Sequence, residues 1–103
     1  MPRLAEVHVI CRKGLNVTDH RGGTFLTGFW VINPDHIHEG MVFALHEEKA
    51  AVSYLQGTVV RVTEVVPRNK DCPYRRVQML VRETSTSLPW RGPGAGERGY
   101  VWV

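Results

Sequence analysis

The sequence predicts a mainly β protein, a small barrel of five or six strands with one or two short helical turns. Several segments show the alternating or Val-rich patterns that are typical of strands, and none keeps a helical period beyond about two turns. In an open sheet, strands this rich in valine would leave exposed edges, and closure into a barrel removes them. The 103 residues fit one domain, spanning residues 1–103.

The composition excludes several other classes of protein. Hydrophobic residues make up 43% of the chain and charged residues 22%, which excludes a disordered chain. No apolar run approaches the ~18 residues of a membrane span, and residues 1–14 lack the apolar core of a signal peptide. We therefore expect a cytoplasmic protein with no membrane partner. With only two cysteines, Cys11 and Cys72, a disulfide framework and a Cys-rich zinc site are excluded as well.

The first third of the chain contains two predicted strands. Residues 5–11 alternate, which predicts a half-buried strand with its polar residues, His8 among them, on the outer face. Residues 12–23 are polar and contain glycines, and this pattern predicts a loop. Residues 24–32 are aromatic and β-branched, so we expect a strand whose central Gly28 marks a bulge or a close backbone approach.

The rest of the chain contains four more predicted strands. Residues 41–46 are almost continuously apolar and predict a short strand that is buried on both faces. Residues 47–53 are the most helix-like segment. Residues 54–66 form the longest predicted strand, and residues 75–84 alternate with valines and a methionine inward and polar residues outward. Residues 98–103 predict a terminal strand that pairs into the sheet.

Basic charge is concentrated in the last third of the chain. Residues 67–103 carry seven basic and three acidic side chains. Six of the seven are arginines, whose planar guanidinium groups suit phosphate. This distribution indicates either an anionic partner or a solvated strand face.

Two of the five histidines, His36 and His38, lie in a segment that predicts one helical turn. Asn33 suits the N-cap and Pro34 the first helical position. The two imidazoles then point about 200° apart, and the usual zinc-binding spacings are absent. We therefore expect surface histidines on a capped turn, and neither a metal nor a cofactor.

His46 ends the buried strand predicted for residues 41–46, and two interpretations remain open. It is either a structural histidine or part of a pocket mouth together with Lys49, Ser53 and Tyr54. In the second case His46 or Lys49 would be the candidate general base of an enzyme.

The segment before the last strand combines arginine with aromatic residues. Trp90 and Arg91 precede the glycine-rich residues 92–97, and Arg98 follows them. Single-stranded nucleic acids need this combination, a cation for phosphate and a flat ring for base stacking. The alternative is that Trp90 packs the loop onto the barrel. Because the glycine-rich segment lacks the Lys-Ser/Thr of a P-loop, a surface loop is favoured over a phosphate cradle.

The middle of the chain, residues 27–66, steps into one strand through Glu39-Gly40-Met41-Val42 and into a later one through Gly57-Thr58-Val59-Val60-Arg61-Val62. This pattern resembles the PUA-like superfamily of ASCH, EVE and PUA domains, although the acidic residue that follows the first glycine in that family is missing. The resemblance implies a pseudobarrel that binds RNA or modified DNA bases in a pocket, and a minority of ASCH-like members are amidohydrolases. By location, the residues near such a pocket would be Trp30, His46, Lys49, Ser53 and Tyr54.

We therefore predict a non-catalytic module that binds RNA, DNA or a small nucleotide-like ligand. One alternative is a small amidohydrolase acting on a modified nucleoside, and another is a module that forms a homodimer or binds a host protein. The residues expected to contact phosphates are Arg75, Arg76, Arg82, Arg91 and Arg98, and those expected to stack on bases are Trp30, Tyr54 and Trp90.

Overall fold

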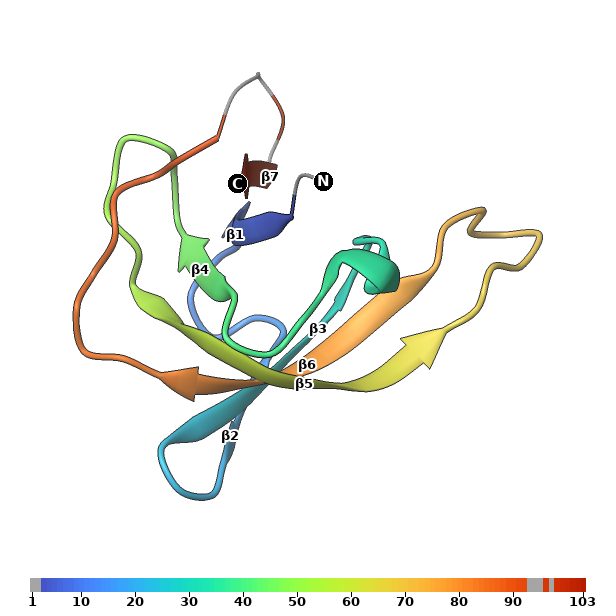
Figure 1. The fold of residues 1–103 in the computed structure, drawn as a ribbon, viewed down its shortest axis with the longest axis horizontal. Coiled ribbons are helices and arrows are strands. Elements are labelled where there is room, and N and C mark those ends of the chain that lie inside the picture. The colour runs from blue at the N-terminus through green and yellow to red at the C-terminus, as the bar shows by residue number, and fades with distance from the viewer. Residues whose placement is uncertain (1–2, 93–95, 97) are drawn as a thin grey trace.

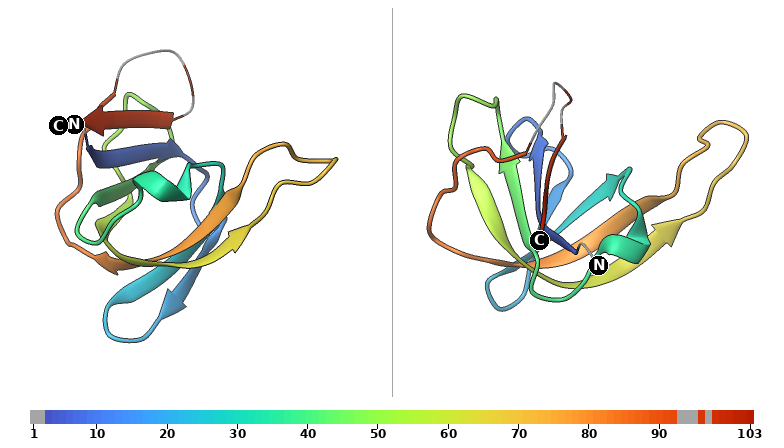
Figure 2. Two further views of the ribbon diagram at one scale, coloured as in Figure 1. Left: turned by 45° about the vertical axis from the view of Figure 1, so that its right-hand side comes forward. Right: turned by 45° about the horizontal axis from the view of Figure 1, so that its top comes forward.

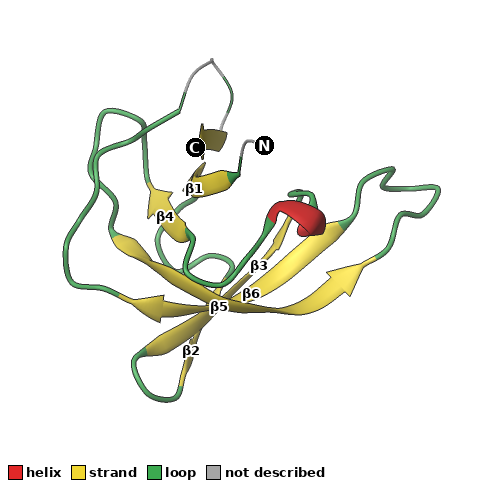
Figure 3. Cartoon of the chain, in the orientation of Figure 1, coloured by secondary structure: helices red, strands yellow, loops and turns green. Residues whose placement is uncertain are grey.

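The computed structural model of the chain describes residues 3–92, 96 and 98–103, and these form one mixed sheet with a single short helix. Figures 1 and 3 show the arrangement. The elements are β1 (Leu4–Ile10), β2 (Val17–His20), β3 (Thr24–Trp30), the 3-10 helix η1 (Pro34–His36), β4 (Val42–His46), β5 (Leu55–Val66), β6 (Arg76–Glu83) and β7 (Arg98–Trp102).

The strand order in the sheet is β2-β3-β6-β5-β4-β1-β7. All neighbours pair antiparallel except β1 and β4, which are parallel. The long β5–β6 hairpin runs beneath the β4-β1-β7 part of the sheet and extends well beyond it (Figures 1 and 2). The core fills the space enclosed by this bend, and its fully buried side chains include Val7, Phe25, Phe43, Leu45 and Met79.

The expected barrel, closed or partly closed, is not confirmed. Within the described residues, β2 and β7 are the two ends of the strand order, and no hydrogen-bonded pairing joins them. The strong bend therefore gives the core its enclosure without closing the sheet. In the same part of the chain, no helix is long and apolar enough to cross a membrane.

Several predicted elements are confirmed. The strand β4 has four fully buried residues in succession, from Phe43 to His46, because it lies between β1 and β5 in the sheet and is covered on both faces. The terminal strand β7 pairs with β1. At Gly28 the register of β3 against β6 shifts, and an added Cβ would lie 2.8 Å from the Cα of Gln78, so the expected close approach is present.

Two local expectations are wrong. Residues 12–23 were expected to be a loop but contain β2, an edge strand whose polar side chains face solvent; an antiparallel edge can be polar in this way because one face is not buried. Residues 47–53 form turns and bends, not a helix. They connect the antiparallel pair β4 and β5, and Ser53 uses its backbone N–H to bond Leu88 O at 2.8 Å.

The capped turn is confirmed. Asn33 accepts a hydrogen bond from Asp35 N at 3.0 Å, and Pro34 begins η1. His36 is exposed, whereas His38 is half-buried because its Nε2 bonds Leu4 O at 2.6 Å. The turn thus places His36 on the surface beside the end of β7.

Candidate functional site

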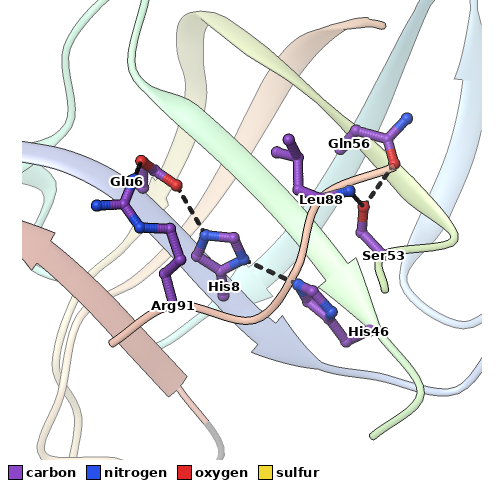
Figure 4. Close-up of polar contacts among 7 residues, drawn as sticks. All are labelled: Glu6, His8, His46, Ser53, Gln56, Leu88 and Arg91. Carbon is purple, nitrogen blue, oxygen red and sulfur yellow. Dashed lines mark hydrogen bonds and ion pairs between the residues drawn. The ribbon is translucent and has the colours of Figure 1, made fainter. Parts of the chain in front are cut away.

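The segment 84–92, between β6 and β7, crosses the face of β1 and β4 that lies opposite the core. It is held first at Thr84, whose N–H donates to Gln56 O at 3.0 Å, and then at Leu88, whose N–H donates to Ser53 Oγ at 2.8 Å. Gly99 of β7 lets the segment pass closely, since a Cβ there would lie 2.1 Å from Arg91 O. Figure 4 shows this path over the two strands.

Beneath this segment lies a chain of hydrogen bonds that we call the histidine relay: Glu6, His8, His46 and the carbonyl of Ala51. Glu6 Oε1 is 2.9 Å from His8 Nε2, His8 Nδ1 is 2.8 Å from His46 Nε2, and His46 Nδ1 is 3.0 Å from Ala51 O. Figure 4 shows the first two of these contacts. Both imidazoles are fully buried. The sequence placed His8 on an outer polar face, and this is wrong because segment 84–92 covers that face.

The ring of Trp90 covers the two imidazoles of the relay. Its ring centroid lies 5.9 Å from that of His8 and 5.2 Å from that of His46. Lys49 Nζ lies 5.5 Å from the centre of the Trp90 ring, and Arg91 donates from Nη1 to Glu6 Oε2. Of the two interpretations of Trp90, the structure shows the packing one, with the half-buried ring holding its segment on the sheet.

The environment of His46 fits a structural histidine. Burial lowers its pKa, an effect that the hydrogen bond to Ala51 opposes and that the nearby His8 reinforces. Both ring nitrogens are hydrogen-bonded and the residue is fully buried. A general base must reach a substrate proton, and His46 has no exposed atom with which to do so.

A second feature is a run of hollows on the surface beside η1. One hollow of about 340 Å³ and another of about 210 Å³ share Val31, Ile32 and Asn33, and a third of about 400 Å³ shares Tyr100 and Trp102 with the second. We call this run the aromatic–arginine track. Its aromatic and basic side chains are Arg68, Tyr74, Arg75, His36, Tyr100, Trp102 and Arg91.

The track leads from the loop between β5 and β6, past η1, to the edge strand β7. Figure 2 (right) shows η1 between that loop and β7. Tyr74 at one end is 61% exposed and Trp102 near the other is 46% exposed, so both rings offer a face to a ligand. His36 stands edge-on to Trp102 with ring centroids 5.0 Å apart. Arg75 Nη2 donates to Asn33 Oδ1 at 2.9 Å and lies 3.5 Å from Asp35 Oδ2.

A separate hollow of about 430 Å³ lies beside Tyr54 and Lys13. Tyr54 donates its hydroxyl to Cys11 O at 2.7 Å, and Lys13 Nζ lies 5.9 Å from the centre of the ring. Burial raises the pKa of Tyr54 and also that of the Cys11 thiol, so both stay neutral near pH 7. Tyr54 lines this hollow and none of the three hollows of the track.

The residues predicted from the sequence do not come together in one site. Trp30 is 7% exposed, donates from Nε1 to Thr27 Oγ1 at 3.0 Å and packs on Phe43, so its ring has no face for a base. Ser53 is buried and, together with His46 and Lys49, contacts segment 84–92, to which Trp90 belongs. Arg75 and Arg91 lie on the track.

The remaining predicted arginines lie elsewhere on the sheet. Arg76 and Arg82 stand at opposite ends of β6, about 20 Å apart along the strand, so they do not form one patch. Arg76 and Arg98 are half-buried, and the Nε of each has no hydrogen-bond partner among the described residues. The glycine-rich residues 92–97, weighed as a phosphate cradle, lie mostly outside the described residues. No group of three or more metal-binding side chains is found within the described part of the chain.

Sequence reasoning missed Glu6 and His8, and it missed the aromatic residues of the track. Glu6 and His8 alternate with buried valines, and nothing in a single strand shows that a distant segment covers its outer face. Tyr74 and Trp102 had a weak signal, since each sits near arginines in the basic third of the chain. Their proximity to η1 arises only from the fold.

Comparison with known proteins gives no relative. No protein-family model matches the chain, and neither the curated proteins nor the solved structures contain a match. The function is therefore inferred from the fold, the buried histidine relay and the aromatic–arginine track alone.

Proposed function

We propose that the protein binds single-stranded nucleic acid, RNA or DNA, along the aromatic–arginine track, without catalysis. The observation that carries this proposal is the exposure of Tyr74 and Trp102 on one run of hollows that also contains Arg68, Arg75 and Arg91. Base stacking on exposed rings and phosphate contacts with cations are the two interactions that single strands require.

The charges on the track favour weak binding. Arg75 lies beside the Asp35 carboxylate and Arg91 beside that of Glu6. A phosphate must therefore replace or share a carboxylate at two of the three arginines, which reduces the gain from each contact. We expect dissociation constants in the micromolar range at low salt, and a steep loss with added salt because phosphate contacts release counterions.

A single strand fits the track better than a duplex. In a duplex the base faces are stacked on one another and are not available to Tyr74 or Trp102. RNA and DNA single strands differ by the 2′-hydroxyl, and Asn33 and His36 are the polar groups of the track that could contact it. Preference for RNA or for modified bases is the finer part of this proposal.

The direct test is fluorescence anisotropy with labelled 12-nucleotide single strands and the matching duplexes. We expect single strands to bind, and Trp102→Leu, Tyr74→Leu and Arg68→Gln each to weaken binding by about five- to tenfold, which corresponds to about 1–1.4 kcal/mol. Arg21→Gln is the matched control, because Arg21 is exposed in the β2–β3 turn, away from the track. Equal binding by the track variants and the wild type would refute the proposal.

No observation favours the amidohydrolase alternative. His46 is buried with both nitrogens engaged, and Lys49 lies against Trp90. The PUA-like resemblance, the homodimer and the cytoplasmic location stay predictions. Analytical ultracentrifugation of the same samples tests the homodimer.

A further inference from the structure

The histidine relay consists of three hydrogen bonds in series, and each bond needs one proton between its two heavy atoms. A carboxylate carries no such proton, and each neutral imidazole carries one. Glu6, His8 and His46 in these forms would supply two protons for three bonds. The geometry of the relay thus requires one more proton than the ordinary neutral-pH forms provide.

The donor and the acceptor of each hydrogen bond can be assigned in turn, starting from the carbonyl oxygen of Ala51. A carbonyl oxygen can only accept, so His46 Nδ1 carries the N–H that reaches Ala51 O at 3.0 Å. A neutral His46 then has a lone pair on Nε2, and His8 must donate to it from Nδ1 at 2.8 Å. In a neutral His8 the remaining lone pair on Nε2 would face the Glu6 carboxylate oxygen at 2.9 Å, and the two would repel.

We propose that the relay holds this third proton on His8, as an imidazolium between Glu6 and His46, and that the charge stabilises the Trp90–Arg91 segment over the sheet. The proton lies on His8 and not on Glu6, because Arg91 donates to the other carboxylate oxygen and so favours the ionised form. His46 is the neutral partner, in agreement with the lowering of its pKa by burial.

The charged groups around the relay agree with this arrangement. Glu6 on β1 is the anion beside His8, and it is also the partner of Arg91. From the segment after β4, the cation of Lys49 lies 5.5 Å from the centre of the Trp90 ring. On the neighbouring strands, Gly99 of β7 and Ala44 of β4 lie opposite His8 and cannot titrate.

The positive charge on His8 also stabilises the position of Trp90. A cation over the face of an indole and within about 6 Å of its centroid is attracted to the ring. The His8 ring centroid lies 5.9 Å from that of Trp90, with the two rings tilted by 57°. Loss of the third proton removes this attraction. It also leaves a lone pair on His8 Nε2 facing the Glu6 carboxylate, and the two repel. The segment that carries Trp90 and Arg91 should therefore loosen at alkaline pH. This conclusion does not depend on whether the track binds nucleic acid.

The test is long-range ¹H–¹⁵N NMR of the histidine rings in the full chain at pH 7.5. We expect both ring nitrogens of His8 to be protonated and His46 to be the neutral Nδ1–H form. In Glu6→Gln the amide N–H can donate to a neutral His8, so His8 should become neutral while His46 stays unchanged. His20, exposed on β2, is the internal reference. A neutral His8 in the wild type would overturn the proposal, and this result does not depend on how well the variant folds.

A second measurement follows the proton itself. An unfolded histidine, with a pKa of about 6.5, is mostly neutral at pH 7.5. Unfolding of the wild type should therefore release about one proton more than unfolding of Glu6→Gln. Between pH 7 and 8 the unfolding equilibrium constant of the wild type should rise more steeply with pH, by up to about tenfold per pH unit. Equal slopes for the two proteins would contradict the proposal.

Discussion

His8 and His46 lie 38 positions apart in the sequence, yet a hydrogen bond of 2.8 Å joins Nδ1 of one to Nε2 of the other in a fully buried site. The parallel pairing of β1 with β4 places them close together, since His8 lies opposite Ala44 and Ile10 opposite His46. Trp90 then closes the site from a third part of the chain. The burial of the His8–His46 pair therefore depends on the packing of the segment between β6 and β7 on the sheet.

Replacing Trp90 by alanine should destabilise the fold, because the ring covers two imidazoles that would then meet water. We expect a loss of about 2–3 kcal/mol in the free energy of unfolding, below the cost for a fully buried tryptophan. Urea denaturation measures this change. Trp102→Ala is the control, since Trp102 is 46% exposed and should cost about 1 kcal/mol or less; equal losses in the two variants would contradict the role given to Trp90.

Replacing Gly99 by alanine should be costly for a different reason. Its Cβ would lie 2.1 Å from Arg91 O, and a backbone atom cannot move aside as a flexible side chain can. We expect a loss of about 3 kcal/mol, at the upper end of the range for overpacking, seen as a lower Tm. Gly96→Ala is the matched control, because the nearest atom to its Cβ would be 3.9 Å away; if Gly99→Ala is as stable as this control, segment 84–92 does not cross β7 as described.

Acid should destabilise the protein through His46. Burial lowers the pKa of His46 in the folded state, so below about pH 6.5 the unfolded chain binds a proton that the folded chain does not. Stability from this group is complete above about pH 6.5 and is lost as the pH falls toward the lower folded pKa. Urea midpoints measured from pH 7 to pH 5 check this, and His46→Asn, which keeps a donor for Ala51 O, should have a shallower slope.

Binding of single-stranded nucleic acid should depend on salt through the three arginines of the track. With about 0.7 counterions released per phosphate contact, three contacts predict a slope of about −2 in a plot of log affinity against log salt. Arg68→Gln should reduce the slope by about 0.7, whereas Arg21→Gln should leave it unchanged. Anisotropy titrations at several salt concentrations measure both, and a slope near zero would show that phosphates are not contacted.

Local patterns predicted most of the strands. The alternation in β6 placed Val77, Met79 and Val81 inside, and all three are fully buried. The N-cap of η1 was also evident, because its hydrogen bond involves residues only two positions apart. These features depend on neighbours in the chain, so a sequence pattern can reveal them.

The arrangement of the sheet and both candidate sites depended on distant contacts. The sequence indicates a closed or partly closed barrel, but pairing between strands depends on which edges meet in space. The described strands leave β2 and β7 as edges. The residues next to Trp90 in the sequence fit either base stacking or packing onto the sheet. They do not indicate that its partners are His8 and His46.

The sequence by itself determined a β protein with a basic, arginine-rich last third and a capped turn at Asn33, because periodicity, charge and capping are local. Only the tertiary structure decided that His8 is buried, that Trp30 is covered and that Tyr74 and Trp102 flank one run of hollows. The physical reason is that burial and proximity are set by segments far apart along the chain, which come together only when the sheet bends around its core.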